Sequence, residues 1–212
     1  MLHVVTAINR YLYEEQLSEF HRHRYDIYIV ERGWRDGLRT VENREYDQFD
    51  DDQATYMLAI EDESVVGGSR LLPTSRPHML ETVCPQLADV RGIPRGPDIY
   101  EWTRLFTIKS RREGRYGGAV LGELFTGTVE YCHSVGIRQI SFVFEARWLP
   151  RLTEMGWRIK PLGLPDFIAG DWWMAATFEI NAALIAMLRR YHRQDGPVLA
   201  NFRHSSSLLQ AS

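Results

Sequence analysis

Hydrophobic positions in the first third of the chain follow a helical spacing and then a strand spacing. A short strand at the N-terminus precedes residues 9–31, whose long side chains recur three or four positions apart and predict one or two helices ending at Gly33. Residues 54–60 and 65–72 are apolar stretches separated by the polar segment 61–64, which predicts strand, turn and strand. The segment thus folds as a helix followed by a hairpin.

The second half of the chain alternates strands with helices. Proline-rich loops precede residues 100–108, whose alternation predicts a central strand. The apolar residues between Val120 and Cys132 fall on one helical face. We further predict strands at 139–144, 156–159 and 173–180 and helices at 148–155 and 182–191. Hairpins followed by strand–helix–strand crossovers predict an α/β protein, a three-layer α/β/α sandwich.

Length and composition are those of one folded domain. The chain has 212 residues, of which 44% are hydrophobic and 25% charged, enough for a sizeable core without disulfides. We see no repeat or linker and expect a single domain at residues 1–193 and a polar C-terminal tail at 194–212. Cys84 and Cys132 form no CxxC pair and are read as free thiols.

Charge and hydropathy exclude several partners. A net charge of −3 provides no general field for nucleic acid. No apolar run approaches the roughly 18 residues of a membrane span, and the N-terminus lacks the features of an export signal. We therefore expect a cytoplasmic protein that binds neither nucleic acid nor membrane.

Metal binding is not indicated. The acidic residues between Asp47 and Asp52 lack the glycine and the spacing of a calcium loop, and His21 and His23 do not face each other on a helix. The acidic stretch is either a solvated loop or a set of carboxylates that faces a cationic ligand.

The central strand carries charges. Alternation places Trp102 and Arg104 on one face and Glu101 on the other. Buried charges have partners or take part in function, so Glu101 is either a functional residue or half of a structural ion pair with Arg70.

A basic, glycine-containing loop precedes the long helix. Arg111, Arg112 and Arg115 combine guanidinium charge with backbone N–H groups at a helix start, which favours a phosphate ligand. The loop is similar to the one that grips the coenzyme A pyrophosphate in N-acetyltransferases, except that Tyr116 stands at a position for a small residue. Most of the six tryptophans are expected in the core, whereas Trp34 could cover a cation with its ring.

The order of these motifs resembles that of the N-acyl-homoserine-lactone (autoinducer) synthases over most of residues 1–180. Two positions depart from the family, Tyr28 and Cys84, where phenylalanine is expected, and the second affects the expected shape of the cofactor pocket. Segments 147–151, 160–165 and 173–177 are most similar to rhizobial members that use branched-chain or aryl acyl-coenzyme A. The motifs are Arg24, the aromatic at 28, Trp34, Glu45-x-Asp47-x-Phe49-Asp50, Gly67-Gly-Ser-Arg70-Leu-Leu-Pro-Thr74 and Glu101-x-Thr-Arg104-Leu-Phe106.

The resemblance implies a GNAT-like fold, with a mixed central sheet and a V-shaped cleft, and an acyltransferase that makes a quorum-sensing signal. The amine of S-adenosylmethionine would attack an acyl thioester, and its carboxylate would then close the lactone ring and release methylthioadenosine. Both compounds are substrates, and no permanent cofactor or metal is expected. The donor would be acyl-coenzyme A or an acyl carrier protein thioester, a possible protein partner.

The resemblance also implies roles for individual residues. Glu101, Arg104 and Asp47 would be catalytic, with Glu101 as base through a water. Arg24, Tyr28, Trp34, Asp47 and Arg104 would bind S-adenosylmethionine, and Asp50 and Arg70 would support them. Trp102, Phe106, Phe142, Phe144, Trp148, Lys109, Arg111, Arg112 and Arg115 would bind the acyl thioester, the basic residues at its phosphates or at a carrier protein.

Two other functions fit parts of the pattern. An N-acetyltransferase that uses acetyl-coenzyme A shares the fold and the thioester cleft but does not need the group of Arg24, Trp34 and Asp47. A non-catalytic sensor of either substrate would keep the binding residues without turnover. The sequence leaves the acyl group and the oligomeric state open.

Overall fold

A mixed eight-stranded sheet forms the centre of the computed structural model, which describes residues 1–34, 38–112 and 118–200. All pairs of neighbouring strands are antiparallel except β6–β7, which is parallel. In order across the sheet the strands are β1 (Leu2–Val5), β4 (Thr55–Glu61), β5 (Ser64–Pro73), β6 (Ile99–Thr107), β7 (Gln139–Glu145), β10 (Asp171–Glu179) and β8 (Lys160–Pro161), with β9 (Asp166–Ile168) paired to β10.

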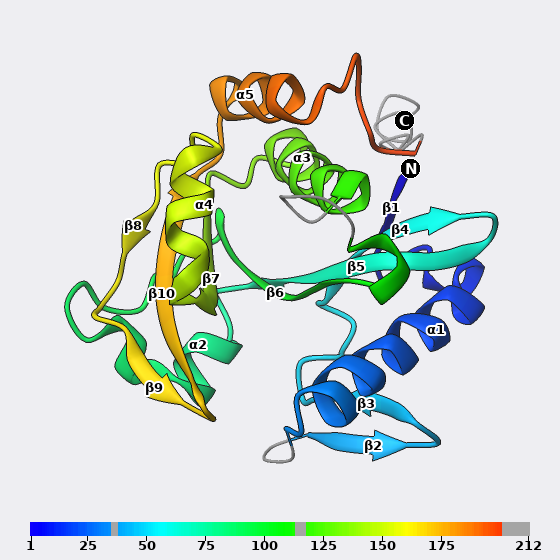
Figure 1. The fold of residues 1–212 in the computed structure, drawn as a ribbon, viewed down its shortest axis with the longest axis horizontal. Coiled ribbons are helices and arrows are strands. Elements are labelled where there is room, and N and C mark those ends of the chain that lie inside the picture. Colours follow the sequence, from blue (N-terminus) through cyan, green and yellow to red (C-terminus); the bar gives the residue numbers. More distant parts are fainter. Residues whose placement is uncertain (35–37, 113–117, 201–212) are drawn as a thin grey trace, which may run out of the picture.

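Helices cover both faces of the sheet, which confirms the three-layer α/β/α prediction (Figure 1). On one face lie α3 (Gly118–Ser134), α4 (Leu149–Glu154) and α5 (Ala182–His192). The other face carries α1 (Glu14–Arg24), the π-helix η2 (Tyr25–Glu31) and α2 (Met79–Val83). Short 3₁₀ helices are η1 (Arg10–Leu12), η3 (Pro85–Ala88), η4 (Lys109–Arg111) and η5 (Ala146–Trp148).

The two central strands diverge part of the way along. Residues 99–102 of β6 pair with 139–142 of β7, and beyond that point neither strand pairs with the other, although β6 continues to Thr107 and β7 to Glu145. This divergence opens the predicted V-shaped cleft in the middle of the sheet. Backbone groups on the inner edges of both strands are therefore free to bond a ligand.

A β-bulge corrects the prediction that Trp102 and Arg104 share a face. The register between β5 and β6 shifts between Gly68 and Arg70, and Arg104 has a φ of 55°, in the left-handed region. As a result, Trp102 packs against Phe125 of α3, whereas Arg104 points toward Tyr28 on the opposite side.

Most predicted elements are present, with differences at two places. The strand predicted at 156–159 is absent there: Gly156, at φ 89°, follows α4, and sheet pairing begins only at Lys160. A small hairpin of β2 (Arg39–Val41) and β3 (Arg44–Tyr46) precedes the acidic residues and was not predicted. Glu42 and Asn43 make its turn, both with positive φ.

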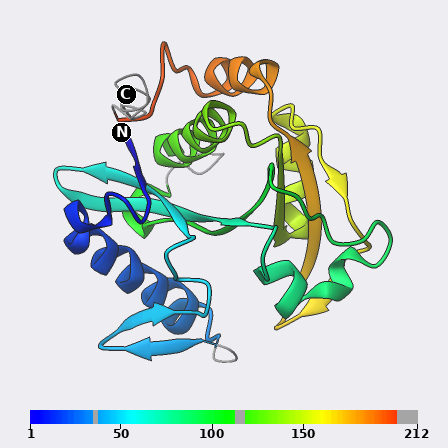
Figure 2. The same cartoon turned by 180° about the vertical axis from the view of Figure 1, so that it is seen from behind.

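The described part of the predicted tail is attached to the domain. Leu2 donates to Val198 O at 3.0 Å and Ala200 donates to Leu2 O at 2.8 Å, so the segment after α5 lies along the free edge of β1 (Figure 2). Residues 198–200 of the predicted tail thus contact β1 through one isolated bridge and two backbone hydrogen bonds. Among the described residues, no helix is both long and apolar enough to span a bilayer.

Candidate functional site

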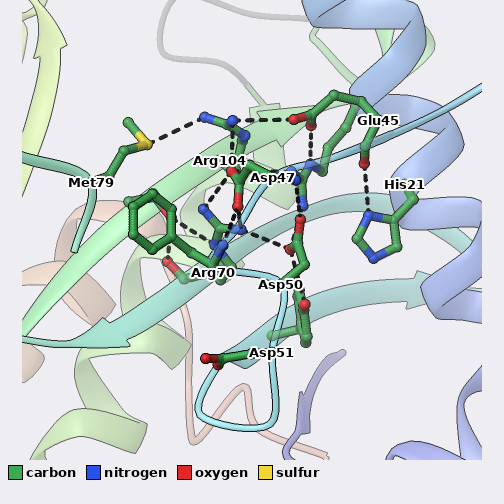
Figure 3. A network of polar contacts seen from close by, with 12 residues as sticks. His21, Glu45, Asp47, Asp50, Asp51, Arg70, Met79 and Arg104 are labelled. Carbon is green, nitrogen blue, oxygen red and sulfur yellow. Dashed lines mark hydrogen bonds and ion pairs between the residues drawn. The ribbon is translucent and has the colours of Figure 1, made fainter. Parts of the chain in front are cut away.

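Three arginines and three carboxylates form one buried network on the α1 side of the sheet (Figure 3). They come from α1, from β3 and the loop after it, and from β5 and β6. Because positive and negative charges are equal in number, the network is electrically balanced. Its members are Arg24, Arg70, Arg104, Glu45, Asp47 and Asp50.

Arg70 and Arg24 anchor the acidic loop. Arg70 contacts Asp47 at 2.6 and 2.9 Å and Asp50 at 2.7 Å. Arg24 contacts Asp50 at 2.7 Å and is hydrogen bonded to Glu45. Both guanidinium groups are fully buried. The side chains of Asp47 and Asp50 are therefore buried and ion-paired, whereas Asp51 and Asp52 of the same stretch are exposed.

Arg104 connects this network to the sheet cleft. It lies 2.7 Å from Asp47 and 3.2 Å from Glu45, and its guanidinium carbon is 5.2 Å from the ring centroid of Tyr28. The bulge in β6 gives it this direction. Its Nε is buried and has no hydrogen-bond partner among the described residues, so one donor of this guanidinium is unused.

Asp47 and Asp50 stay ionised at neutral pH. Burial alone raises the pKa of Asp47, but Arg70 and Arg104 outweigh it and hold the pKa below its usual value. Asp50 behaves in the same way because Arg24 and Arg70 face it. The neighbouring His21 has its pKa lowered to about 4 by burial and by Arg24. It is neutral at pH 7 and donates its Nδ1–H to Glu45 O at 2.9 Å.

A cavity of about 660 Å³ lies where β6 and β7 diverge. One wall is made by the π-helix and the residues after it, where Tyr28 and Trp34 stack with ring centroids 5.2 Å apart. Trp34 also meets Trp173 of β10 edge to face, and the guanidinium carbon of Arg32 is 5.2 Å from its ring centroid. These rings lie beside Arg104, so aromatic faces and a cation meet at this end of the cavity.

A second aromatic group lines the same cavity on the side of α3 and α4. Phe142 and Phe144 of β7 stack at 4.6 Å, and Phe178 meets Trp157 edge to face at 4.6 Å. Phe106 lines the cavity from the α1 side, and the other apolar lining residues are Trp102, Leu121, Phe125, Phe142, Phe144, Trp148, Leu152, Trp157 and Phe178. Such a surface suits an apolar group of limited length.

Glu101 lies just behind the cavity wall. It is completely buried and accepts hydrogen bonds from the backbone N–H groups of Met79, at 2.7 Å, and Leu80, at 2.8 Å. Burial raises its pKa to about 7, against the opposing effect of these two bonds. The ion pair with Arg70 is not formed, because Arg70 is bonded to Asp47, Asp50 and Thr103.

Most of the residues predicted to bind the thioester line the cavity, but only some of those predicted to bind S-adenosylmethionine do so. Tyr28, Trp34, Arg104 and Arg112 line it, as do all five predicted aromatic residues. The other charged residues lie behind the wall, namely Arg24, Asp47, Asp50, Arg70 and Glu101. Lys109 and Arg111 do not line it, and Arg115 is outside the described residues.

Several contacts could not be assigned from the sequence. Glu45, quoted only as part of a motif, is fully buried and contacts Arg24 and Arg104. Glu145 pairs with Arg32 across the cavity at 2.6 Å, and no sequence signal marks this pair. Cys84 packs under α2 and does not line the cavity. No group of metal-binding side chains occurs within the part of the chain described.

Comparison with known proteins identifies close relatives. A family model described as autoinducer synthase matches residues 9–185. Isovaleryl-homoserine lactone synthase of Bradyrhizobium diazoefficiens is 42% identical over 205 residues, which cover 94% of this chain and 91% of that protein. The solved structure of BjaI, a CoA-dependent acyl-homoserine lactone synthase with SAM and isopentyl-CoA, has a TM-score of 0.87 at 40% identity and covers 94% of this chain and 92% of its own.

A more distant likeness concerns the fold alone. The structure of a putative N-acetyltransferase from Lactobacillus plantarum matches with a TM-score of 0.55 at 17% identity, covering 85% of this chain and 99% of that one. The expected acetyltransferase-like fold is thereby confirmed.

Proposed function

Because the chain belongs to the autoinducer synthase family and is an acyl-homoserine-lactone synthase, we propose that it joins S-adenosylmethionine to a short branched or aryl acyl group delivered by coenzyme A. One observation carries this proposal: a single cavity is lined at one end by the rings of Tyr28 and Trp34 beside Arg104 and elsewhere by the aromatic group around Phe142 and Phe144. The first end suits a cationic nucleoside and the aromatic group suits a compact apolar acid.

The reaction has two steps. The α-amine of S-adenosylmethionine attacks the thioester carbonyl, the new C–N bond forms, the C–S bond breaks, and the thiol leaves while the amine gives up a proton. The carboxylate then attacks the γ-carbon and displaces methylthioadenosine from the sulfonium. Positioning alone can lower the barrier of such an intramolecular step by roughly 7–11 kcal/mol.

The charged network positions the donor. Arg104 lines the cavity and has an unused Nε donor, so it would hold the substrate carboxylate. Asp47, 2.7 Å from Arg104 and behind the cavity wall, would orient Arg104 and favour the amine through its negative charge. Tyr28 and Trp34 would present their ring faces to the adenosyl-sulfonium region. Arg24, which is fully buried, would act by holding Glu45 and Asp50, while Asp50 and Arg70 fix the acidic loop.

Glu101 is the base in this proposal. A pKa of about 7 leaves a large ionised fraction at neutral pH and lies within about one unit of the pKa of an α-amine, so proton transfer between the two groups costs little. The carboxylate does not line the cavity, so a water would relay the proton. Two backbone N–H groups from Met79 and Leu80 hold the carboxylate in place.

The acyl group would lie against the aromatic group around Phe142 and Phe144. The hydrogen-bonded pairing of β6 with β7 ends at Trp102, so backbone N–H groups of β6 beyond this residue are available to bond the thioester carbonyl. Phe142 and Phe144 would pack on the chain and limit its length. The CoA-dependent relative bound to isopentyl-CoA supports the choice of carrier and of a short branched acid.

Mass spectrometry of the product tests the proposal. The enzyme is given S-adenosylmethionine and a mixture of isovaleryl-, cinnamoyl- and dodecanoyl-CoA. We expect isovaleryl- or cinnamoyl-homoserine lactone with an equal amount of methylthioadenosine. Product mainly from dodecanoyl-CoA would refute the acyl preference. An acetyltransferase would release no methylthioadenosine.

Two further assays test the carrier and separate an enzyme from a sensor. With one acyl group offered on both carriers, coenzyme A should give the higher kcat/KM, and preference for acyl carrier protein would reverse this part of the proposal. Glu101→Gln should fold and bind S-adenosylmethionine but lose turnover, whereas a sensor would keep its ligand response.

A further inference from the structure

The cavity is lined by more positive than negative side chains, in a protein whose net charge is −3. Five arginines and two glutamates line it. Excess guanidinium charge around one opening attracts an anion, because the field there is opposite to that of the whole protein. The seven residues are Arg32, Arg104, Arg112, Arg147, Arg151, Glu31 and Glu145.

Four of these arginines already have carboxylate partners. Arg104 belongs to the buried network, and Arg112 contacts Glu31 at 3.0 Å. Arg32 contacts Glu145 at 2.6 Å. Arg147 is ion-paired to Glu145 as well and lies 3.6 Å from Asp171. An added anion would have to compete with these carboxylates.

Arg151 differs from the other four. Across residues 1–34, 38–112 and 118–200 its side chain has no ion pair or hydrogen bond, and the one partner of its guanidinium group is the ring of Trp148, whose centroid is 5.1 Å from the guanidinium carbon. Stacking holds the planar guanidinium group without using its N–H donors. The residue is exposed, so all five donors remain available to a ligand that enters from solvent.

The position of Arg151 places it beside the path of the thioester carrier. It lies on α4, directly after β7, whereas Arg112 comes from the segment after β6, and both line the cavity between these strands. Trp148 lines the same cavity one turn before Arg151. The carrier of an acyl group held beside Phe142 and Phe144 would leave the cavity past these side chains.

We propose that Arg151 binds a phosphate group of the thioester carrier and that Trp148 positions it for this contact. The inference rests on the proposed function and adds a carrier-binding residue on the α4 side of the cleft. A guanidinium fork fits phosphate oxygens in pairs, which an ammonium group cannot do. The 4′-phosphate occurs in both possible carriers, whereas the other phosphates belong to coenzyme A alone.

Kinetics with truncated thioesters test this contact. Arg151→Gln is compared with wild type on isovaleryl-CoA, isovaleryl-4′-phosphopantetheine and isovaleryl-pantetheine. We expect KM for isovaleryl-CoA to rise about tenfold or more with kcat nearly unchanged, as the loss of one charge-assisted hydrogen bond implies. KM for the pantetheine thioester, which has no phosphate, should stay the same.

Two variants serve as controls. Arg158→Gln removes an exposed arginine that does not line the cavity and should change no constant. Arg151→Lys keeps the charge and should restore part of the affinity. A higher KM for the phosphopantetheine thioester would identify the 4′-phosphate as the ligand, and a change confined to isovaleryl-CoA would identify the nucleotide phosphates.

Direct binding separates this inference from the proposed function. Calorimetry of free coenzyme A should give a dissociation constant about tenfold or more higher for Arg151→Gln than for wild type, whether or not a lactone is made. An equal constant, or an equal rise of KM for all three thioesters, overturns the inference. Absence of lactone from every acyl-CoA, with coenzyme A binding still dependent on Arg151, would instead overturn the proposed function.

Discussion

Arg70 holds Asp47 by two parallel hydrogen bonds, from Nη1 to Oδ1 at 2.6 Å and from Nη2 to Oδ2 at 2.9 Å. Its Nη1 also donates to Asp50 at 2.7 Å, so one buried guanidinium fastens both ends of a tight acidic turn. Ion pairs at this turn connect side chains from α1, β3, β5 and β6. The pair of Arg70 and Asp47 therefore contributes both to the stability of the fold and to the position of Arg104 in the site.

Removal of Arg70 should strongly destabilise the fold. Arg70→Met leaves Asp47 and Asp50 buried with less positive charge, and loss of one partner of a buried ion pair costs about 3–5 kcal/mol. Urea unfolding followed by circular dichroism measures the free energy of unfolding. Arg70→Lys keeps a charge but not the paired geometry and should fall between the variant and wild type.

The matched control is the exposed pair of Arg76 and Asp51, which are 3.8 Å apart. Arg76→Met should change the free energy of unfolding by less than about 1 kcal/mol, since surface ion pairs contribute little. Similar losses for the two methionine variants would contradict the assigned importance of the buried network.

The stacked rings of Tyr28 and Trp34 should govern affinity for S-adenosylmethionine. Trp34→Leu removes one face of the stack, and a contact between a cation and a partly desolvated ring contributes about 1–2 kcal/mol, so the dissociation constant should rise about tenfold. Calorimetry measures it. Tyr28→Phe keeps the ring and should bind within about threefold of wild type. Equal binding by Trp34→Leu would rule out this role.

Local periodicity was sufficient to predict the main elements of the fold. The face of α3 from Val120 to Cys132 is buried, as predicted. The predicted strands coincide within a few residues with β4, β5, β6, β7 and β10. Both predictions succeed because the buried side of a helix or strand requires apolar residues at the period of that element. Five aromatic residues of the cavity were predicted through family resemblance, namely Trp102, Phe106, Phe142, Phe144 and Trp148, and all five line it. Phe125, Trp157 and Phe178 also line it and were not predicted there.

Long-range geometry could not be predicted. Arg104 itself has a left-handed backbone conformation within β6, which turns its side chain to the opposite face. A prediction that assumes regular alternation of side chains along a strand cannot anticipate this change. The pair of Arg32 and Glu145 joins residues 113 positions apart. Arg111, predicted at the phosphates, instead contacts Glu61 at 2.7 Å. Each depends on the final packing of segments that are far apart in the chain.

Phe142 should limit the length of the acyl group. Its ring stacks on Phe144 and meets Phe178 edge to face, which fills this part of the cavity. Phe142→Ala should raise the ratio of kcat/KM for octanoyl-CoA over isovaleryl-CoA about tenfold or more, since each accommodated methylene is worth about 1–3 kcal/mol. Phe167→Ala changes an exposed ring outside the cavity and should leave the ratio unaltered. No shift in Phe142→Ala would place the acyl chain elsewhere.

His21 should make the protein less stable in acid. Its pKa of about 4 lies below the value of about 6.5 in the unfolded chain, so the unfolded state binds the proton more tightly. The stabilising contribution is complete above pH 6.5 and falls by about 3 kcal/mol as the pH drops to 4. Urea titrations at several pH values should show a flatter profile for His21→Asn, which keeps a donor for Glu45 O.

Subtraction of the two profiles isolates this histidine. The raised pKa of Glu101 gives the opposite slope, because its contribution is complete below about pH 4.5 and is lost as the pH rises through 7. That contribution is common to wild type and His21→Asn and cancels in the difference. Parallel profiles would show that His21 does not titrate as its burial indicates.

Glu101 should set the pH dependence of catalysis. A base must be ionised, so kcat/KM should fall about tenfold per unit below the pKa of about 7. The amine of the free substrate adds a separate limb near its own pKa of about 7.7–8. Glu101→Gln should be at least about 100-fold slower, with only the amine limb left in its pH–rate profile. Stopped assays of methylthioadenosine between pH 5.5 and 9 measure both profiles. If the slow variant kept the limb near 7, Glu101 would serve only to hold the start of α2 through Met79 and Leu80, and the base would have to be sought elsewhere.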